Sequence, residues 1–324
     1  LLQIPEYLKK IKGDVIYASK PMFTSYDVGL LKKSLNSKPL VLDIDDWQMG
    51  FAKDGEEKNQ DGYYRRIRSF LGSVKSSLIN PNNSKLVVRL NEKLTNLADK
   101  VTVSNTFLKE KFGGEIIWHA RDAEQFSPDR YNSGWLKEKY GLQKNEKVVM
   151  FSGTPKPHKG VMDLVDAMER LSEGVLFIVG VDKQDYCKKI VTQAEAKLGE
   201  GRIRTAGLQP FKKIPEFLSL ADVIVVPQRK TYSTIGQMPA KIFDAMAMEK
   251  PIVATKVSDI PKVLGNAGWL VEPGRPNQLS AALLEALENP NKANKMASLA
   301  RNHFLQSYSY SAVRGKLVDI FANF

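Results

Sequence analysis

Short apolar runs rich in Val and Ile alternate with segments of helical spacing along the whole chain. Such runs, separated by helix-length segments, are typical of parallel strands covered by helices on both faces. The predicted strands span residues 14–19, 39–45, 100–104, 115–120, 148–153, 175–180, 202–207, 223–227, 251–255 and 268–272. The sequence therefore predicts an α/β protein built from two doubly wound, Rossmann-like units.

Pro, Asn, Ser and Gly cluster within residues 124–134 and predict a boundary there. We expect a first domain over residues 1–123 and a second over residues 124–303. Residues 304–324 continue a segment of helical spacing (302–321) and are predicted to form a helix that packs back on the first domain. The chain starts in a helical pattern without an initiator Met. We therefore expect an incomplete N-terminal domain, with a first strand and its Gly-rich turn upstream.

Composition narrows the class of protein. The single cysteine, Cys187, excludes an internal disulfide and a cysteine-rich metal site. No apolar run approaches the roughly 20 residues that a membrane span needs, and the first residues do not resemble a secretory signal. We therefore expect a cytoplasmic location. The net charge of +12 favours phosphate-rich partners. It is spread over both halves without an aromatic-basic platform, so nucleic acid is not expected.

The segment FSGTPKPHKG (151–160) joins a predicted strand to a predicted helix. The strand ends at Gly153, and Lys159 and Gly160 open the helix. Amide groups at a helix N-terminus, with a lysine beside them, form a good phosphate site. The GxxxxGK[ST] pattern of a P-loop is absent. A solvated connection between strand and helix is the alternative for this loop taken alone.

A second connection of the same kind follows the strand at 223–227. Pro239 stands near the predicted helix start, where its missing N–H is tolerated. Asp244 lies in the first two helical turns, within reach of a ribose hydroxyl pair. Open α/β sheets bind ligands at this edge. The loop amides expected to point at a diphosphate are those of Thr234, Ile235, Gly236, Gln237 and Met238.

In order and spacing, most of residues 97–288 resemble the retaining glycosyltransferases of family 4 (glycosyl transferases group 1). The matching stretches are LADKVTVSNTFLKEKF, IIWHARDAEQFSP, FSGTPKPHKGVMDLVDAM, VLFIVG, RIRTAGLQPFKKIPEFLSLADVIVVP, PAKIFDAMAMEKPIVAT and GNAGWLVEPGRPNQLSAALLEAL. The resemblance implies the GT-B fold, in which two Rossmann-like domains face a cleft. The second domain would bind the nucleotide-sugar donor, and the first would face the acceptor.

The resemblance implies a role for the 151–160 loop. The family's GR-x4-KG segment places an Arg and a Lys on the donor diphosphate. Gly153, Lys159 and Gly160 match this segment, but Thr154 stands at the Arg position. Lys159 is then the main cation, aided by Lys156 or His158.

Further roles follow from the family's E-x7-E motif. Its second carboxylate holds the nucleotide ribose, and Asp244 occupies that place. The first Glu falls at Gly236, so the sugar-facing carboxylate is missing or replaced by backbone groups. Leu208 and Gln209 match the family's base-binding position.

On the acceptor side, Asp43, Asp45, Asp46 and Trp47 gather at the tip of the strand at 39–45. Family members often carry a His-Asp or related polar pair near the transferred sugar, and Asp45 and Asp46 are expected to stand in for it. A purely structural loop is the alternative. The acidic triplet also resembles a DxD metal site, but GT-B enzymes usually dispense with metal and no partner cluster is evident. No metal site is therefore predicted.

The segment 63–79 is amphipathic, with apolar residues on one helical face and Arg65, Arg66, Arg68 and Lys75 away from it. Two interpretations remain open. The helix packs on a core in the ordinary way, or it contacts an anionic membrane peripherally at its inner face.

The sequence thus predicts a nucleotide-sugar-dependent hexosyltransferase of cell-envelope or polysaccharide biosynthesis. It would move a sugar from a UDP-, GDP- or ADP-linked donor to a glycan, lipid-linked or other hydroxyl acceptor, with retention and without a cofactor. Lys159, Asp45 and Asp46 are its candidate catalytic residues. One alternative is a non-catalytic GT-B-like partner subunit, suggested by Thr154 and Gly236. The other is a sugar-nucleotide epimerase, which requires acidic and histidine residues around the sugar.

Overall fold

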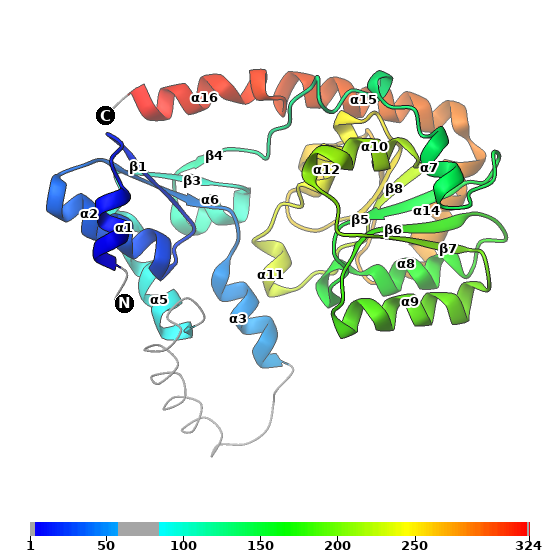
Figure 1. Cartoon of the computed structure of the whole chain (residues 1–324), viewed down its shortest axis with the longest axis horizontal. Helices are drawn as coiled ribbons and strands as arrows, with labels where there is room; N and C mark the ends of the chain where they lie inside the picture. The colour runs from blue at the N-terminus through cyan, green and yellow to red at the C-terminus, as the bar shows by residue number, and fades with distance from the viewer. Residues whose placement is uncertain (1–3, 58–83, 323) are drawn as a thin grey trace, which may run out of the picture. The chain divides into compact units, whose positions relative to one another are not determined.

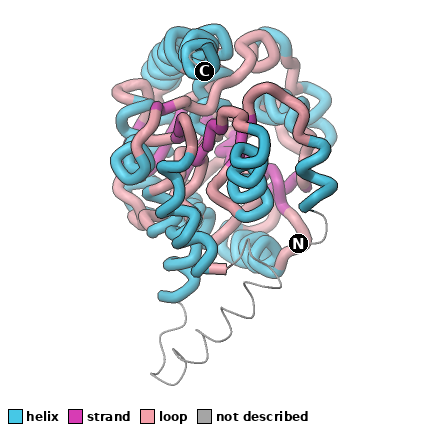
Figure 2. Tube along the Cα trace, turned by 90° about the vertical axis from the view of Figure 1, so that its left-hand side faces the viewer, coloured by secondary structure: helices cyan, strands magenta, loops and turns pink. Residues whose placement is uncertain are grey.

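The structure, a computed structural model, describes residues 4–57, 84–322 and 324, with the backbone alone at 55–57. The predicted amphipathic segment 63–79 lies outside the described residues. The chain divides into two compact units. Unit 1 comprises Leu1–Trp118, Thr231–Met238 and Lys316–Phe324, and unit 2 comprises His119–Lys230 and Pro239–Gly315. Each unit is an α/β layer structure in its own right. Figure 2 shows the helices and strands by colour along the chain.

Unit 1 is built on a parallel sheet in which the described strands follow the order β1-β2-β3-β4. The strands are β1 (Ile16–Ser19), β2 (Leu40–Ile44), β3 (Lys100–Val103) and β4 (Glu115–Ile116). The helices described in this unit are α1 (Ile4–Lys10), the π-turn η1 (Phe23–Asp27), α2 (Val28–Asn36), α3 (Gln48–Glu57), α5 (Lys85–Leu94), the 3-10 turn η3 (Thr95–Leu97), α6 (Thr106–Phe112) and α11 (Tyr232–Ile235). Leu40, Leu42 and Ile44 of β2 are fully buried at the centre of its core.

Unit 2 is built on a larger parallel sheet, whose described strands follow the order β10-β9-β8-β5-β6-β7. The strands are β5 (Val148–Ser152), β6 (Val175–Val181), β7 (Ile203–Gly207), β8 (Val223–Val226), β9 (Ile252–Thr255) and β10 (Trp269–Val271). The chain starts at the centre with β5, builds to one edge through β6 and β7, and returns to the centre with β8. Because β5 and β8 are neighbours whose connections leave in opposite directions, they form a topological switch point.

Helices cover both faces of this sheet. Figure 1 shows α8 and α9 on one face of the sheet and α10 and α12 on the other. The helices described in unit 2 are η4 (Pro128–Arg130), α7 (Gly134–Lys139), η5 (Pro157–Lys159), α8 (Val161–Met168), α9 (Asp185–Leu198), η6 (Phe211–Lys213), α10 (Ile214–Ser219), α12 (Lys241–Ala247), α13 (Ile260–Leu264), α14 (Pro276–Glu288), α15 (Pro290–Ser307) and the first part of α16 (Tyr310–Ala322).

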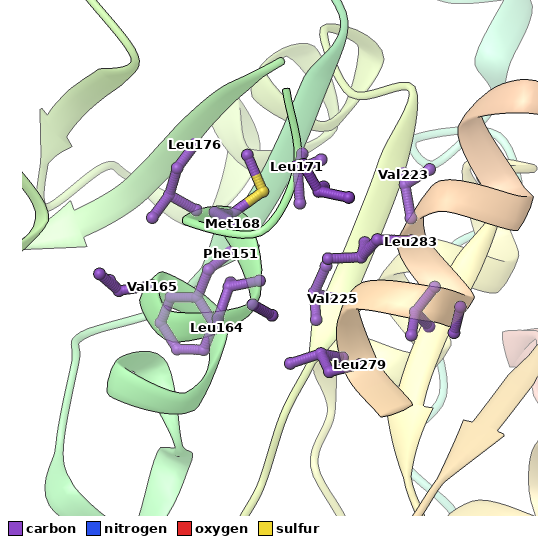
Figure 3. Close-up of a cluster of buried hydrophobic side chains, with 14 of the residues drawn as sticks. Phe151, Leu164, Val165, Met168, Leu171, Leu176, Val223, Val225, Leu279 and Leu283 are labelled. Atoms are coloured by element: carbon purple, nitrogen blue, oxygen red, sulfur yellow. The ribbon is translucent and has the colours of Figure 1, made fainter. Parts of the chain in front are cut away.

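The core of unit 2 lies between the sheet and the helices α8, α9 and α14. Figure 3 shows Leu164 and Met168 of α8 and Leu279 and Leu283 of α14 beside Val225 of β8. Val149 and Phe151 of β5 belong to the same cluster, as expected for alternate side chains on one face of a strand. Burial of these side chains holds the helices, and hence the loops that enter them, against the sheet.

The predicted fold class is confirmed in its secondary structure. Among the described residues, every predicted strand forms, and each pairs in parallel. The reason is clearest for β5 and β8, whose apolar runs are buried at every position, as in a parallel sheet covered by helices on both faces.

The C-terminal segment differs from its prediction. The sequence predicts one helix over 302–321, but α15 ends at Ser307 and α16 starts at Tyr310. The break forms because the Tyr308 carbonyl accepts from the Arg121 N–H at 3.2 Å, and the Tyr310 N–H donates to the Arg121 carbonyl at 2.9 Å. The Ser309 hydroxyl then accepts from the Ala312 N–H and starts α16. In unit 1, Lys100 Nζ donates to the Ile320 carbonyl at 2.6 Å.

No helix in the described ranges is both long enough and apolar enough to cross a bilayer.

The packing of α14 predicts that substitution of two adjacent leucines lowers stability to different extents. Leu283 is fully buried in the cluster, whereas the neighbouring Leu284 is 43% exposed. We expect Leu283→Ala to destabilise unit 2 by about 2–5 kcal/mol because it leaves a cavity. Leu284→Ala should change stability by less than about 1 kcal/mol. Urea denaturation followed by tryptophan fluorescence measures both, and equal losses would contradict this packing.

Candidate functional site

The switch point of unit 2 brings two connections together. β5 pairs with β8 through Val149 with Val223 and Met150 with Ile224. The loop after β5 carries residues 153–160 and leads to α8, while the connection after β8 starts at Pro227. Because parallel strands end at the same edge, both loops leave the sheet side by side.

Two glycines allow this approach. At Gly160, φ is +66°, and a Cβ there would lie 1.8 Å from the Pro227 carbonyl oxygen. At Gly153, φ is +141°. A Cβ on Gly180, at the end of β6, would lie 2.9 Å from the Gly153 carbonyl carbon. The loop after β5 therefore rests directly on the backbone of its neighbours, which side chains at these positions would prevent.

Two lysines lie next to Gly153. A Cβ built on Gly153 would be 3.7 Å from Lys159 Nζ and 3.6 Å from Lys241 Cε. Lys159 is the predicted main cation, and it comes from η5 in the same loop. Lys241 is the first residue of α12 and is not among the site residues predicted from the sequence. The signal that could have found it is its position three residues before Asp244, where helical side chains meet.

Asp244 is fully buried, and its side chain is 1% exposed. Its Oδ1 accepts from Arg121 Nε at 2.5 Å, and its Oδ2 faces Lys241 Nζ at 3.4 Å. The Arg121 guanidinium stacks on Phe211, 5.3 Å from the ring centroid. The buried carboxylate is thus neutralised by a guanidinium that is itself shielded from water. The ribose-binding role of Asp244 stays a prediction.

A second ion pair, between the exposed Arg229 and the buried Asp163, links the two connections to each other. Arg229 donates from Nε and Nη2 to the two oxygens of Asp163 at 2.8 and 2.6 Å. The Arg229 N–H also donates to the His158 carbonyl at 2.9 Å. Hydrogen bonding to Asp163 raises the pKa of the Arg229 guanidinium further above its high ordinary value. A bidentate pair of this kind has a defined geometry, so it limits the movement of the loop that carries Lys159.

The other side of this loop rests on Cys187 and Asp182. The Cys187 thiol donates to the Pro155 carbonyl at 3.7 Å. Burial raises the pKa of this thiol, and its hydrogen bond to Asp182 adds to the effect. Hydrogen bonds from Cys187 and Gln184, with the charge of Lys156, hold the pKa of Asp182 below its usual value. Cys187 therefore supports the loop as a neutral thiol. Lys156, in the same loop, interacts electrostatically with the Asp182 carboxylate.

The predicted base-binding residues follow β7. Leu208 is 67% exposed, and Gln209 Nε2 donates to the Gly207 carbonyl at 3.1 Å. β7 pairs in parallel with β6, which pairs with β5. Leu208 and Gln209 therefore lie at the carboxyl ends of the strands, as Gly153 does. Their role in base binding stays a prediction.

In unit 1, Asp46 holds a polar cluster at the end of β2. Lys20 Nζ lies 2.7 Å from Asp46 Oδ2, and Gln237 Nε2 donates to Asp46 Oδ1 at 2.8 Å. Burial disfavours the charge on Lys20, but the hydrogen bond and charge of Asp46 outweigh this and raise its pKa. The carbonyl of Asp45 accepts from the Ser104 hydroxyl at 2.6 Å. Both predicted acids thus have structural partners, and a catalytic role for them stays a prediction.

The predicted diphosphate loop Thr234–Met238 is grouped with unit 1. The N–H groups of Ile235 and Gln237 donate to the carbonyls of Thr231 and Thr234 at 3.2 and 3.3 Å. Thr234 and Met238 are buried. Two of these backbone N–H groups thus form hydrogen bonds within residues 231–237 themselves. A contact from the segment to a diphosphate stays a prediction.

Gly236, at the place of the family's first Glu, lies against Trp47. The Trp47 N–H donates to the Gly236 carbonyl at 3.0 Å, and a Cβ on Gly236 would lie 2.3 Å from Trp47 Cβ. Trp47 Nε1 in turn donates to Glu92 at 2.7 Å. Glycine at this position thus has a steric cause inside unit 1. Among the described residues, no group of three or more His, Cys, Asp or Glu could hold a metal ion.

Comparison with known proteins agrees with this geometry. Residues 135–303, just over half of the chain, match the family described as "Glycosyl transferases group 1". The chain belongs to this family. The matched range includes the switch point of unit 2, both of its loops and Asp244.

This member of glycosyl transferases group 1 is similar to two curated transferases. It is 28% identical to alpha-D-kanosaminyltransferase from Streptomyces kanamyceticus over 57% of this chain and 48% of the relative. It is 24% identical to the GDP-mannose-dependent alpha-(1-6)-phosphatidylinositol monomannoside mannosyltransferase from Mycolicibacterium smegmatis, over 70% of this chain and 63% of that protein. The chain thus spans about half to two thirds of the length of these relatives.

Solved structures identify the fold of the group 1 chain. The crystal structure of Anabaena Alr3699/HepE in complex with UDP-glucose superimposes with a TM-score of 0.78 at 20% identity, covering 99% of this chain and 82% of that one. Sucrose-phosphate synthase from Thermosynechococcus elongatus gives a TM-score of 0.69 at 18% identity, covering 99% and 78%. The fold is therefore GT-B, with two Rossmann-like domains, as predicted.

The buried pair of Arg121 and Asp244 predicts that substitution of Arg121 lowers the stability of unit 2. We expect Arg121→Met to destabilise unit 2 by about 3–5 kcal/mol because Asp244 loses its main partner in a buried site. Adding Asp244→Asn should recover part of this loss. Arg130→Met removes an exposed arginine of the same segment and should change little. Chemical denaturation measures all three; an unaffected Arg121 variant would show that the pair does not stabilise the fold.

Restoring the family's carboxylate should damage unit 1. Both Gly236→Ala and Gly236→Glu place a Cβ against Trp47, so we expect losses of about 1–3 kcal/mol or more from overpacking. Gly13→Ala, whose Cβ would meet no atom closer than 3.4 Å, is the control. Thermal unfolding compares the variants. Wild-type stability of Gly236→Glu would mean that Trp47 does not exclude a side chain here.

Proposed function

We propose that this chain transfers a sugar from a nucleoside-diphosphate sugar to a hydroxyl group, with retention at the anomeric carbon, as in family 4. The observation that carries the proposal is Lys159, whose ammonium lies beside Gly153 at the switch point of unit 2. Ligands of open α/β sheets bind at such a point. A cation fixed there, in a group 1 family member, suits a donor diphosphate.

Lys159 would act on the leaving group. As the bond between the anomeric carbon and the phosphate oxygen breaks, negative charge develops on the nucleoside diphosphate. A preorganised ammonium stabilises that charge more than it stabilises the intact donor. The N-terminal amides of α8, which starts directly after Gly160, would add to this stabilisation.

The acceptor hydroxyl would attack on the face that the leaving group departs from. Its oxygen forms the new bond to the anomeric carbon, and its proton passes to the departing phosphate. This path needs no covalent nucleophile from the protein. We further propose that Asp45 and Asp46 orient the acceptor, that Asp244 binds ribose, and that Leu208 and Gln209 contact the base. We expect no metal requirement.

The names of the relatives support a proposal for the substrate class. Their names include a GDP-mannose-dependent transferase acting on phosphatidylinositol monomannoside and a putative colanic acid biosynthesis glycosyltransferase. We propose a glycan or lipid-linked acceptor, a UDP-, GDP- or ADP-linked donor and a role in cell-envelope or polysaccharide synthesis. A cytoplasmic protein with a peripheral membrane contact through 63–79 would suit such an acceptor.

One observation favours a second candidate function. The place of the family's first carboxylate is occupied by Gly236 against Trp47, and Thr154 replaces the family's arginine. A non-catalytic subunit that binds nucleotide would tolerate both changes. An active enzyme must compensate for them with other groups.

A nucleotide panel tests the proposal. We expect UDP, GDP or ADP to raise the melting temperature because a ligand of the native state stabilises it. Lys159→Ala should abolish that shift, while Lys188→Ala, at an exposed lysine of α9, should keep it. An unchanged shift in Lys159→Ala would place the phosphate site elsewhere.

Activity separates the candidates. With the UDP-, GDP- and ADP-sugars, transfer to acceptors in a membrane extract, undiminished by EDTA, would support the proposed enzyme. Nucleotide binding without transfer or donor hydrolysis would favour the partner subunit. Release of a free, epimerised sugar nucleotide would indicate an epimerase.

A further inference from the structure

Two lysines, Lys159 from the connection after β5 and Lys241 from the start of α12, lie beside Gly153. We propose that Lys241 is a second diphosphate-binding cation, which replaces the arginine that family 4 places at the position of Thr154. This inference rests on the proposed function, because it assigns a further ligand of the same diphosphate.

The positions of Lys241 and Lys159 would let both bind one diphosphate. Lys159 Nζ lies 3.7 Å, and Lys241 Cε 3.6 Å, from the Cβ position of Gly153. Lys159 Nζ and Lys241 Cε are therefore at most about 7 Å apart, and the Lys241 ammonium lies one bond beyond Cε. The oxygens of a diphosphate can span a separation of this order. Lys159 reaches this point from the connection after β5, and Lys241 reaches it from α12, which follows β8. The switch point is what allows both to do so.

The charges around Lys241 would allow its ammonium group to bind an anion. Asp244 is already neutralised by Arg121 at 2.5 Å, whereas Lys241 stands farther off at 3.4 Å. Two cations and one carboxylate leave a surplus positive charge in this group. The Lys241 side chain is 35% exposed, and an ammonium has three donors, of which one faces Asp244. Asp244 and Arg121 thus act as positioning residues for Lys241.

A lysine from α12 can replace the missing arginine because its task is electrostatic. Lysine binds phosphate as a point charge and does not need the planar fork of a guanidinium. Because Lys241 approaches from α12 and Lys159 from the connection after β5, the two cations would contact different phosphate groups of the diphosphate. Lys241 should therefore matter more for a nucleoside diphosphate than for a monophosphate.

Calorimetric titration tests this assignment. UDP, GDP and ADP are titrated into the wild-type chain, and the tightest binder and its monophosphate are then compared across variants. We expect Lys241→Met to weaken diphosphate binding about 10- to 100-fold, as for loss of one charge-assisted hydrogen bond, and monophosphate binding less than about threefold. Lys241→Arg should keep most of the affinity. Lys295→Met removes an exposed lysine of α15 and should bind as wild type.

The outcomes separate this inference from the proposed function. If Lys159→Met loses affinity and Lys241→Met does not, the assignment of Lys241 is wrong while the donor site stands. Equal weakening of diphosphate and monophosphate would also overturn the assignment, because it indicates a structural effect through Asp244. If the wild-type chain binds no nucleoside diphosphate, the proposed function and the role of Lys241 both fail. Should Lys241→Met not fold, Lys241→Gln decides by the same comparison.

Discussion

The contact of Gly160 with the carbonyl of Pro227 is the constraint on which the site of unit 2 depends. β5 and β8 are parallel neighbours, and the chain leaves them toward opposite edges of the sheet. The loop after β5 can lie on the end of β8 only because Gly160 has no side chain and a left-handed backbone. Lys159 is thereby held beside Gly153, and Arg229 locks the arrangement through Asp163. The cation that we assign to the diphosphate owes its position to this close backbone approach and to the core beneath it.

Two cations of unit 2, Arg121 and Lys241, lie around the buried carboxylate of Asp244. An isolated ion in such a place is costly, so Asp244 must be paired. Arg121 supplies the short, shielded contact, and Lys241 the longer, exposed one. This difference in burial is why we assign Arg121 to the stability of the fold and propose that Lys241 exchanges Asp244 for a ligand.

Unit 1 explains a departure from the family pattern. Gly236 replaces a glutamate of the motif, and the sequence alone presents this as a loss. In the structure the same glycine accepts the Trp47 N–H and leaves room for the Trp47 side chain. Asp46 then joins Lys20 to Gln237 in the adjoining turn. The glycine, the tryptophan and the acid form one packed arrangement, so the exchange of glutamate for glycine is part of how this segment folds.

The α/β class, the strands among the described residues and their parallel pairing were predictable from the sequence, because they follow from short, local runs of apolar residues. Spacing and family resemblance also singled out Lys159, Gly160 and Asp244. The pairing of Arg121 with Asp244, 123 positions apart in the chain, is evident only from the folded protein. The same holds for the approach of Lys159 and Lys241 to Gly153, the packing of Trp47 on Gly236 and the helix break at Ser309. Each of these depends on residues far apart in sequence that the sheet brings within a few ångströms, and local patterns carry no record of such distances.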